Sequence, residues 1–317
     1  MSLRSVFKQQ GGFSLVKNYA QNHVLLYAAF MFAVLPKNKK GLEMLRECVD
    51  FKIYSHLKRK YRKVLAHSAK SESQSVAPAS EKPKIIWFCW LQGIENVPPL
   101  VKKCYENLVY HCSDYTVNIV TAQNLSQYTD LPDYILKKWQ RGIISAAHFS
   151  DILRTNLLVN HGGFWIDSTV LLTAKIPEDI ENAPLFLFRT YKPGSNGHCT
   201  NISSWFISSM TQNPVLVASQ NLLFAYWKKR NSLCHYFLYH FFVEMALTKY
   251  SDENLTIPKY TNETPHFLLF ELGNQVDKVK WESIVAQSFC HKLTNKLSEE
   301  VKTRNNTFYK YVIGDNY

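Results

Sequence analysis

The sequence predicts an α/β fold, with a mostly parallel central sheet flanked by helices and a helical extension at the N-terminus. Short apolar runs, such as residues 85–90 and 164–166, indicate strands that are buried on both faces. Helical patterns separate these runs, and a strand–helix–strand order predicts parallel neighbours. The 317 residues, 46% of them hydrophobic and 14% aromatic, suffice for one large domain with an appendage.

The N-terminal segment, residues 1–66, is expected to be helical and basic. Residues 1–70 contain 14 of the 37 Lys and Arg residues but only 3 of the 25 Asp and Glu residues, which places +11 of the net charge of +12 there. The apolar run at 23–35 is shorter than the roughly 20 residues that span a bilayer. Two interpretations stay open, a buried helix packed on the main domain or peripheral attachment to anionic lipid. Nucleic acid is not expected as a partner, because no recognised binding module accompanies the basic segment.

Residues 67–82, rich in Ser, Ala and Pro, are predicted to be a linker, and residues 83–317 to form the main domain. Its first elements should make a right-handed βαβ unit. The expected elements in chain order are a strand at 85–90, a helix at 98–111, a strand at 116–120, helices at 132–140 and 143–160, strands at 164–166, 185–188 and 201–208, and an aromatic helical region at 215–249. Within that last region, His235 and His240 are expected to be core residues.

One segment in the middle of the chain carries most of the chemistry. Asp151 and Arg154 lie three residues apart on a predicted helix and therefore project from the same face. Gly162 and Gly163 suit the end of that helix, where a left-handed backbone is needed. The following strand delivers Asp167 to its carboxyl end, where ligands bind in open α/β sheets. A carboxylate there could hold sugar hydroxyls, a ribose, or a divalent metal on a diphosphate.

This motif resembles the sugar-nucleotide site of glycosyltransferases with an Asp-x-Asp sugar-binding region, in particular the capsular polysaccharide synthesis protein family. That family is related to fungal initiating mannosyltransferases and clostridial toxin glucosyltransferases. The shared pattern is Ser-Asp-x-x-Arg, an apolar helix, Gly-Gly, three apolar residues and Asp-x-Asp; here it reads Ser150-Asp151-Ile152-Leu153-Arg154, Gly162-Gly163-Phe164-Trp165-Ile166 and Asp167-Ser168-Thr169. Thr169 stands where the wider pattern has a second Asp, a departure that weakens the expected metal site.

The resemblance implies a type-A glycosyltransferase fold and transfer of a hexose from a nucleotide-diphosphate sugar to a growing surface or capsular polysaccharide, with retention of configuration. It assigns catalytic roles to Asp151, Arg154 and Asp167, and a Mn²⁺ or Mg²⁺ ion to Asp167 with Thr169. A base platform is expected at Trp90, and diphosphate contacts at two late residues. The residues expected to bind donor are Trp90, Asp151, Arg154, Gly162, Gly163, Asp167, His291 and Lys292.

The implied partners are the nucleotide sugar and a glycan or lipid-linked oligosaccharide acceptor. Seven scattered cysteines without a C-x-x-C pair suit a reducing cytoplasm. Together with the basic segment, the resemblance implies a cytoplasmic location, peripheral on the inner face of the cell membrane. Two alternatives stay open. One is a non-catalytic nucleotide-sugar-binding or membrane-docking subunit with a degenerate Asp-x-Asp motif, and the other is a phosphoryl-sugar transferase.

Overall fold

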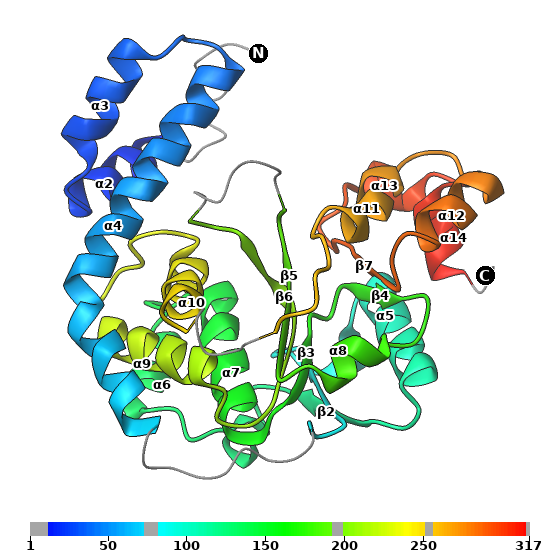
Figure 1. Cartoon of the computed structure of the whole chain (residues 1–317). Helices are drawn as coiled ribbons and strands as arrows, with labels where there is room; N and C mark the ends of the chain where they lie inside the picture. The colour runs from blue at the N-terminus through cyan, green and yellow to red at the C-terminus, as the bar shows by residue number, and fades with distance from the viewer. Residues whose placement is uncertain (1–11, 73–81, 192–198, 251–255, 315–317) are drawn as a thin grey trace.

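The computed structural model describes residues 12–72, 82–191, 199–250 and 256–314, and its centre is a five-stranded sheet of order β2-β1-β3-β6-β5 (Figure 1). The strands are β1 (Ile85–Cys89), β2 (Thr116–Val120), β3 (Gly163–Ile166), β5 (Leu185–Arg189) and β6 (Ile202–Ser209). β1 pairs in parallel with β2 and β3, whereas β6 runs antiparallel to β3 and β5. Four of the five strands therefore point the same way, which confirms the predicted mostly parallel sheet.

Alternating strand residues supply two cores on opposite faces of the sheet. Trp165 contributes to the core beneath α7 (Ala146–His161), α9 (Pro214–Lys229) and α10 (Leu238–Lys249). Phe164 and Ile166, its neighbours, contribute to the core on the other face, beneath α5 (Pro99–His111). The predicted α/β architecture is thus confirmed, with helices on both faces.

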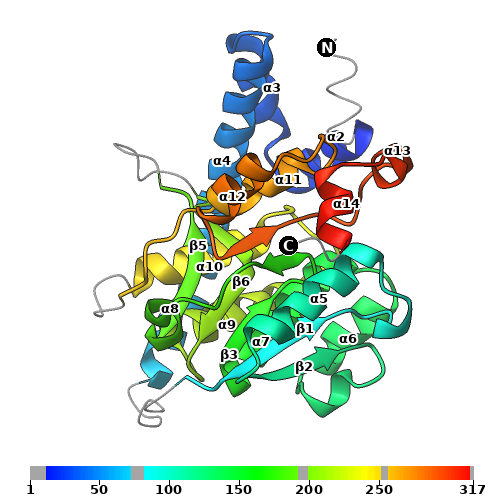
Figure 2. The ribbon, with the colours of Figure 1, turned by 90° about the vertical axis from the view of Figure 1, so that its right-hand side faces the viewer.

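A smaller antiparallel sheet joins β4 (Val170–Leu172), which directly follows the Asp167 turn, to β7 (Cys290–Lys292). Neither strand was predicted, because three residues are too few to show a period in the sequence. β7 belongs to a C-terminal group of elements that packs through its own apolar core on α5 and β4 (Figure 2). The remaining elements are α6 (Asp133–Gln140), α8 (Glu178–Asn182), α11 (Phe267–Glu271), α12 (Lys278–Val285), α13 (Glu299–Thr303), α14 (Phe308–Ile313), and the 3-10 turns η1 (Ile94–Asn96), η2 (Leu125–Gln127) and η3 (Thr264–His266).

The predicted helical, aromatic region at 215–249 is confirmed and consists of two helices, α9 and α10. Arg230, at the end of α9, is extended, and the Tyr226 hydroxyl closes the following loop. That hydroxyl donates to the carbonyl oxygen of Ser232 at 2.7 Å and accepts from the backbone N–H of Cys234 at 2.8 Å. Hydrogen bonds between the Tyr226 side chain and these backbone groups take the place of helical hydrogen bonds after α9.

The N-terminal extension is a hairpin of α2 (Phe13–Gln21) and α3 (Leu25–Val34) on the long helix α4 (Lys39–Glu72). α4 packs along α9 and α10, while α3 and the first turns of α4 project beyond the main body (Figures 1 and 2). The end of α2 contacts the loop after α9, where the Asn18 amide donates to the carbonyl oxygen of Leu233 at 3.4 Å and the Asn22 amide donates to that of Cys234 at 2.7 Å. The buried face of α4 consists of Leu45, Val49, Ile53, Tyr54, Leu57 and Tyr61. No helix within the described ranges is long and apolar enough to cross a membrane.

α4 continues through Glu72, so the predicted linker at 67–82 does not begin at His67. The reason is local anchoring of the helix end against α9. The Ser68 hydroxyl donates to the carbonyl oxygen of Val64 at 3.1 Å and accepts from the Asn221 amide at 3.0 Å. Of the rest of that predicted linker, residues 73–81 lie outside the described residues, as do residues 1–11 of the basic segment.

Candidate functional site

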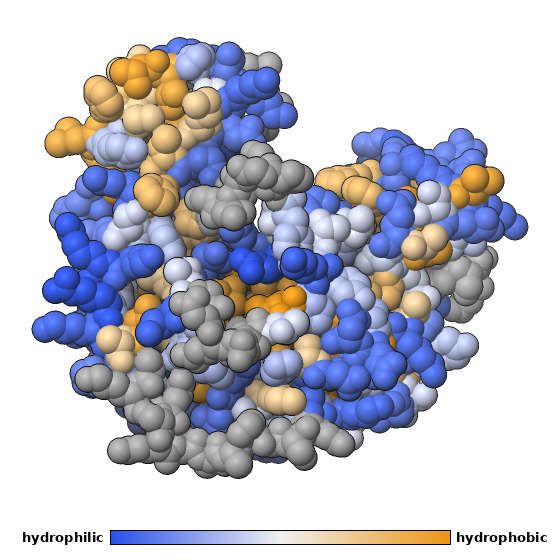
Figure 3. Space-filling view, in the orientation of Figure 1, coloured by the Kyte–Doolittle hydropathy of each residue, from blue (hydrophilic) through white to orange (hydrophobic). Residues whose placement is uncertain are grey.

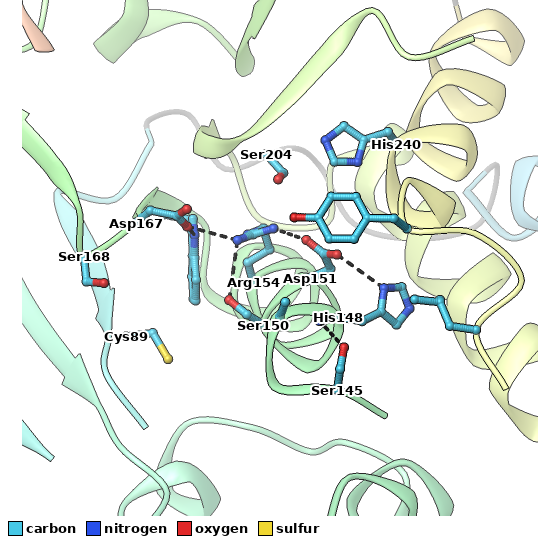
Figure 4. A pocket seen from close by; sticks show the side chains of 14 residues that line it. Cys89, Ser145, His148, Ser150, Asp151, Arg154, Asp167, Ser168, Ser204 and His240 are labelled. Carbon is cyan, nitrogen blue, oxygen red and sulfur yellow. Dashed lines mark hydrogen bonds and ion pairs between the residues drawn. The ribbon is translucent and has the colours of Figure 1, made fainter. Parts of the chain in front are cut away.

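A pocket of about 240 Å³ lies at the carboxyl end of β3, between α7 and α10 (Figure 4). Pockets that enclose a whole ligand are larger, roughly 300–1,000 Å³, so this one suits a sugar-sized part of a longer molecule. Its lining residues are Cys89, Ser145, Ala147, His148, Ser150, Asp151, Arg154, Trp165, Asp167, Ser168, Ser204, Leu233, Tyr236 and His240.

Arg154 occupies the centre of the charged part of the pocket. Its side chain is 4% exposed and lies between two carboxylates, with Asp151 on one side and Asp167 on the other (Figure 4). One guanidinium nitrogen donates to Asp151, and the other donates to Asp167 Oδ1 at 3.0 Å and to the Ser150 hydroxyl at 3.4 Å. The guanidinium also lies 4.9 Å from the centroid of the Trp165 ring. Residues from α7 and β3 that the sequence predicted to cooperate are therefore in direct contact.

The electrostatics of the cluster keep Asp167 ionised. Burial alone would raise the pKa of this carboxyl, but Lys292 and Arg154 outweigh burial and hold the pKa below its usual value. Burial likewise opposes the charge of Arg154, yet Asp151 and Asp167 raise the pKa of the guanidinium. The buried charges are thus paired, as buried ions must be.

Lys292 enters the cluster from β7. Its ammonium donates to Asp167 Oδ2 at 3.2 Å and to the Thr169 hydroxyl at 2.6 Å. Backbone pairing fixes this approach, because Lys292 lies opposite Val170 and the N–H of Leu293 donates to the carbonyl oxygen of Thr169 at 2.8 Å. The C-terminal region therefore supplies the second cation beside Asp167.

The residues present do not fit the predicted Mn²⁺ or Mg²⁺ site at Asp167 and Thr169. Asp167 Oδ1 accepts from Arg154 and from the Trp165 indole N–H at 2.8 Å, and Oδ2 accepts from Lys292. The Thr169 hydroxyl is also bound by Lys292. Among the described residues, no three His, Cys, Asp or Glu side chains group together as a metal site would need.

Three other predicted donor-binding residues lie away from the pocket. Gly162 and Gly163 are at the opposite end of β3 from Asp167, with φ of +65° and +86°. A Cβ on Gly163 would lie 2.3 Å from the carbonyl oxygen of Ile85, so this glycine permits close packing of β1 rather than approach of a sugar. His291 points to the opposite side of β7 from Lys292, is fully buried, and lies 3.1 Å from the Thr173 hydroxyl.

Trp90 follows β1 and is half-buried at the same sheet edge as Asp167, because β1 and β3 are parallel. Its backbone N–H donates to the carbonyl oxygen of Val120 at 3.0 Å. Trp90 does not line the pocket. The base-stacking role predicted for Trp90 therefore stays a proposal.

Two histidines that line the pocket were missed by sequence reasoning. His148 precedes Asp151 by three residues on α7, and its Nδ1 lies 3.3 Å from Asp151 Oδ2; helical spacing could have identified it. His240 reaches the pocket from α10, whereas the sequence predicted a core residue (Figure 4). Burial lowers the pKa of His240 to about 4, so its ring is neutral near pH 7. His235, by contrast, lies against Asp50, with Nε2 and Oδ1 3.0 Å apart.

Comparison with known proteins finds one matching family and several similar proteins. The family model described as capsular polysaccharide synthesis protein matches residues 37–312. Among curated proteins, the O-glycosyltransferase braB of Annulohypoxylon truncatum is 32% identical over 106 residues, which cover 31% of this chain and 25% of that protein. The O-glycosyltransferase PaGT of Phomopsis amygdali is 27% identical over 121 residues, covering 34% of this chain and 29% of that protein. The matched stretches thus span less than a third of either relative.

Solved structures with a related arrangement include the PaToxG glycosyltransferase, with 14% identity and a TM-score of 0.36 over 82% of this chain and 95% of that chain. A glycosyltransferase involved in the glycosylation of the major capsid of PBCV-1 gives 13% identity and a TM-score of 0.33 over 69% of this chain and 98% of that chain. TM-scores below 0.5 are too low to support an argument about the site.

Proposed function

This chain belongs to the capsular polysaccharide synthesis protein family, and from that premise we propose that it transfers a hexose from a nucleotide-diphosphate sugar to a growing surface or capsular polysaccharide. The observation that carries the proposal is Arg154 held between Asp151 and Asp167, with Lys292 beside them, at a sugar-sized pocket. Carboxylates accept hydrogen bonds from sugar hydroxyls, and cations pair with phosphate. The names of the two fungal relatives, both O-glycosyltransferases, support a hydroxyl acceptor.

In the proposed reaction, Asp151 and Asp167 orient the sugar while Arg154 and Lys292 face the diphosphate. Negative charge develops on the departing nucleoside diphosphate, and fixed cations stabilise it. Both pocket-lining carboxylates among the described residues are already engaged by Arg154, which leaves no free carboxylate to act as a nucleophile. With the retention of configuration that the resemblance implies, we therefore favour same-face attack by the acceptor. The anomeric configuration of the product, measured by NMR, tests this part.

Hydrolysis of the donor in the absence of acceptor tests the function directly. Purified protein is incubated with a panel of UDP- and GDP-sugars, and the released nucleoside diphosphate is measured. We expect one donor to be cleaved, and Asp167→Ala to abolish cleavage while Asp133→Ala, at an exposed carboxylate on α6, leaves it unchanged. Donor binding without cleavage, even with acceptor glycans added, would favour the non-catalytic alternative. Failure to bind any donor would refute the assignment.

The projecting hairpin supports the further proposal that the protein docks peripherally on anionic membrane at the inner face of the cell membrane. Large apolar side chains are exposed on this surface, including Leu26 at 87% and Phe30 at 63%. Figure 3 shows hydrophobic residues gathered over the upper left of the molecule, where α3 lies. Exposed Lys37, Lys39 and Lys40 follow immediately. Apolar side chains bordered by lysines are the composition that binds the lipid interface. α3 packs on α4 rather than within the main domain, which disfavours the buried-helix interpretation.

Vesicle co-sedimentation tests the docking proposal. The protein should bind phosphatidylserine-containing vesicles and bind pure phosphatidylcholine vesicles much less. A Leu26→Ser, Phe30→Ser double variant should lower the bound fraction at least about 10-fold, because each buried apolar side chain contributes about 1.5–3 kcal/mol. The matched control is Phe270→Ser, which removes a similarly exposed side chain from the C-terminal region. Equal loss in both variants would contradict docking through the hairpin.

A further inference from the structure

The metal position predicted from the Asp-x-Asp resemblance is taken by a side chain. Lys292 Nζ lies between Asp167 Oδ2, at 3.2 Å, and the Thr169 hydroxyl, at 2.6 Å. These two groups begin and end the turn in which a divalent cation was expected. A cation bound to both oxygens would have to occupy the place of the ammonium.

The position of this ammonium is built into the fold. β7 pairs with β4 directly after the turn, and the Leu293 N–H bonds the Thr169 carbonyl oxygen. The Lys292 side chain is only 20% exposed, so its range of movement is limited. Strand alternation sends the preceding His291 into the interior and leaves Lys292 facing Asp167.

The charges around the turn balance without a metal. Asp151 and Asp167 contribute two negative charges, and Arg154 and Lys292 contribute two positive charges in direct contact with them. A site built for a divalent cation presents an excess of oxygen ligands and carboxylate charge. Here each oxygen of Asp167 already accepts a hydrogen bond from a nitrogen donor.

Lys292 also has the capacity to bind a substrate. A lysine ammonium has three N–H donors, and the contacts with Asp167 and Thr169 use two of them. The third N–H remains for an oxygen outside the cluster. Since lysine acts as a compact point charge toward phosphate, a diphosphate oxygen at the mouth of the pocket is the matching acceptor.

We propose that Lys292 takes the place of the divalent cation, so that this chain binds the diphosphate of its donor and releases it without metal. The inference rests on the proposed glycosyl transfer. The bond between the anomeric carbon and the β-phosphate oxygen breaks, and its electron pair stays on that oxygen. The acceptor hydroxyl oxygen forms the new bond to the anomeric carbon, and its proton passes to the departing phosphate. Lys292 keeps its proton throughout and stabilises the charge left on the phosphate.

The test measures binding of UDP and GDP to the full chain by isothermal titration calorimetry, in EDTA and then with excess Mn²⁺. We expect the nucleotide that binds to keep its Kd within about two-fold between the two conditions, and donor hydrolysis to persist in EDTA. Lys292→Met should weaken binding at least 10-fold in EDTA, and Lys292→Arg should weaken it less. Lys296→Met, an exposed lysine on the following loop, should have no effect.

A second variant keeps the result interpretable if Lys292→Met is poorly folded. Thr169→Asp combined with Lys292→Met restores an Asp-x-Asp pair without the ammonium, so its nucleotide binding should become dependent on Mn²⁺. Wild-type binding or hydrolysis that is lost in EDTA and restored by Mn²⁺ overturns the inference but leaves the proposed function standing. Absence of UDP and GDP binding in both conditions overturns the two together.

Discussion

Replacing Arg154 with methionine removes the cation that joins the two carboxylates of the site. Methionine roughly preserves the length of the buried stem, so the main change is loss of charge and of the hydrogen bonds to Asp151, Asp167 and Ser150. Asp167 keeps Lys292 as a partner, whereas Asp151 is 13% exposed and retains only the histidine at 3.3 Å. The variant should therefore be destabilised by carboxylates that are buried and poorly paired.

The Arg154→Met variant should lose about 3 kcal/mol of its free energy of unfolding. Removing one partner of a buried ion pair costs about 3–5 kcal/mol, and the lower end applies because the Asp167 side chain is 25% exposed. Unfolding entropy of about 2.1 cal/mol/K per residue amounts to about 0.7 kcal/mol/K for this chain, so Tm should fall by about 4–5 °C. The control Arg141→Met, at an exposed arginine after α6, should stay within about 0.5 kcal/mol of wild type.

Urea unfolding at about pH 7 and about pH 4 tests the electrostatic cause. In the wild type, the pKa of Asp167 is lowered, so its contribution is present above the unfolded pKa of about 3.9 and is lost as pH falls through the folded value. Without Arg154, part of that lowering is absent while burial remains. The difference in free energy of unfolding between variant and wild type should therefore be largest at pH 7 and become smaller as the pH falls. The same difference in free energy of unfolding at both pH values, or an equal destabilisation by Arg141→Met, would refute the reasoning.

Asp167→Asn keeps the shape of the side chain but removes its charge, and donor hydrolysis should fall about 100-fold or more; an unchanged release of nucleoside diphosphate would contradict the site. In urea unfolding, Gly163→Ala should lower the free energy of unfolding by at least about 2 kcal/mol, because its Cβ would meet the Ile85 carbonyl oxygen at 2.3 Å. The control Gly142→Ala, at a φ of +70° in open space, should lower it by only about 1–2 kcal/mol. Burial lowers the pKa of His291 to about 4, so the stability that its neutral form provides is full above about pH 6.5 and is lost as pH falls toward 4. In the His291→Gln variant, the urea midpoint of unfolding should change less between pH 4 and about pH 6.5 than in the wild type. The same pH dependence in both proteins would show that His291 is not the titrating group.

Local patterns in the sequence were sufficient to predict the sheet and the first half of the site. Asp151 and Arg154 share a helical face by spacing alone, and the strand at 164–166 places Asp167 at its end. The elements at 98–111 and 116–120 are found as α5 and β2 with nearly the same bounds. Each of these predictions depends on residues that are close together in the chain.

Long-range contacts account for what the sequence could not predict. Lys292 was expected to bind the donor, but its contact with Asp167 was not predicted. That contact joins residues 125 positions apart, through a three-residue strand that has no recognisable period. His240 resembles a core residue because its neighbours are aromatic, and only the packing of α10 brings it to the pocket. The two glycines were ambiguous for a different reason, since a left-handed backbone is needed equally for a helix end and for a ligand loop.

The arrival of Lys292 on β7 also determines when the pocket can be completed during synthesis. Chains emerge from the ribosome N-terminus first, so the sheet and its Asp167 turn are available to fold while β7 is still unmade. Until then Thr169 and one oxygen of Asp167 have no ammonium between them, and the cluster carries one more negative charge than positive. A nascent chain at that stage should repel an anionic donor. The proposed sugar transfer would then begin only after the C-terminal region has docked on α5.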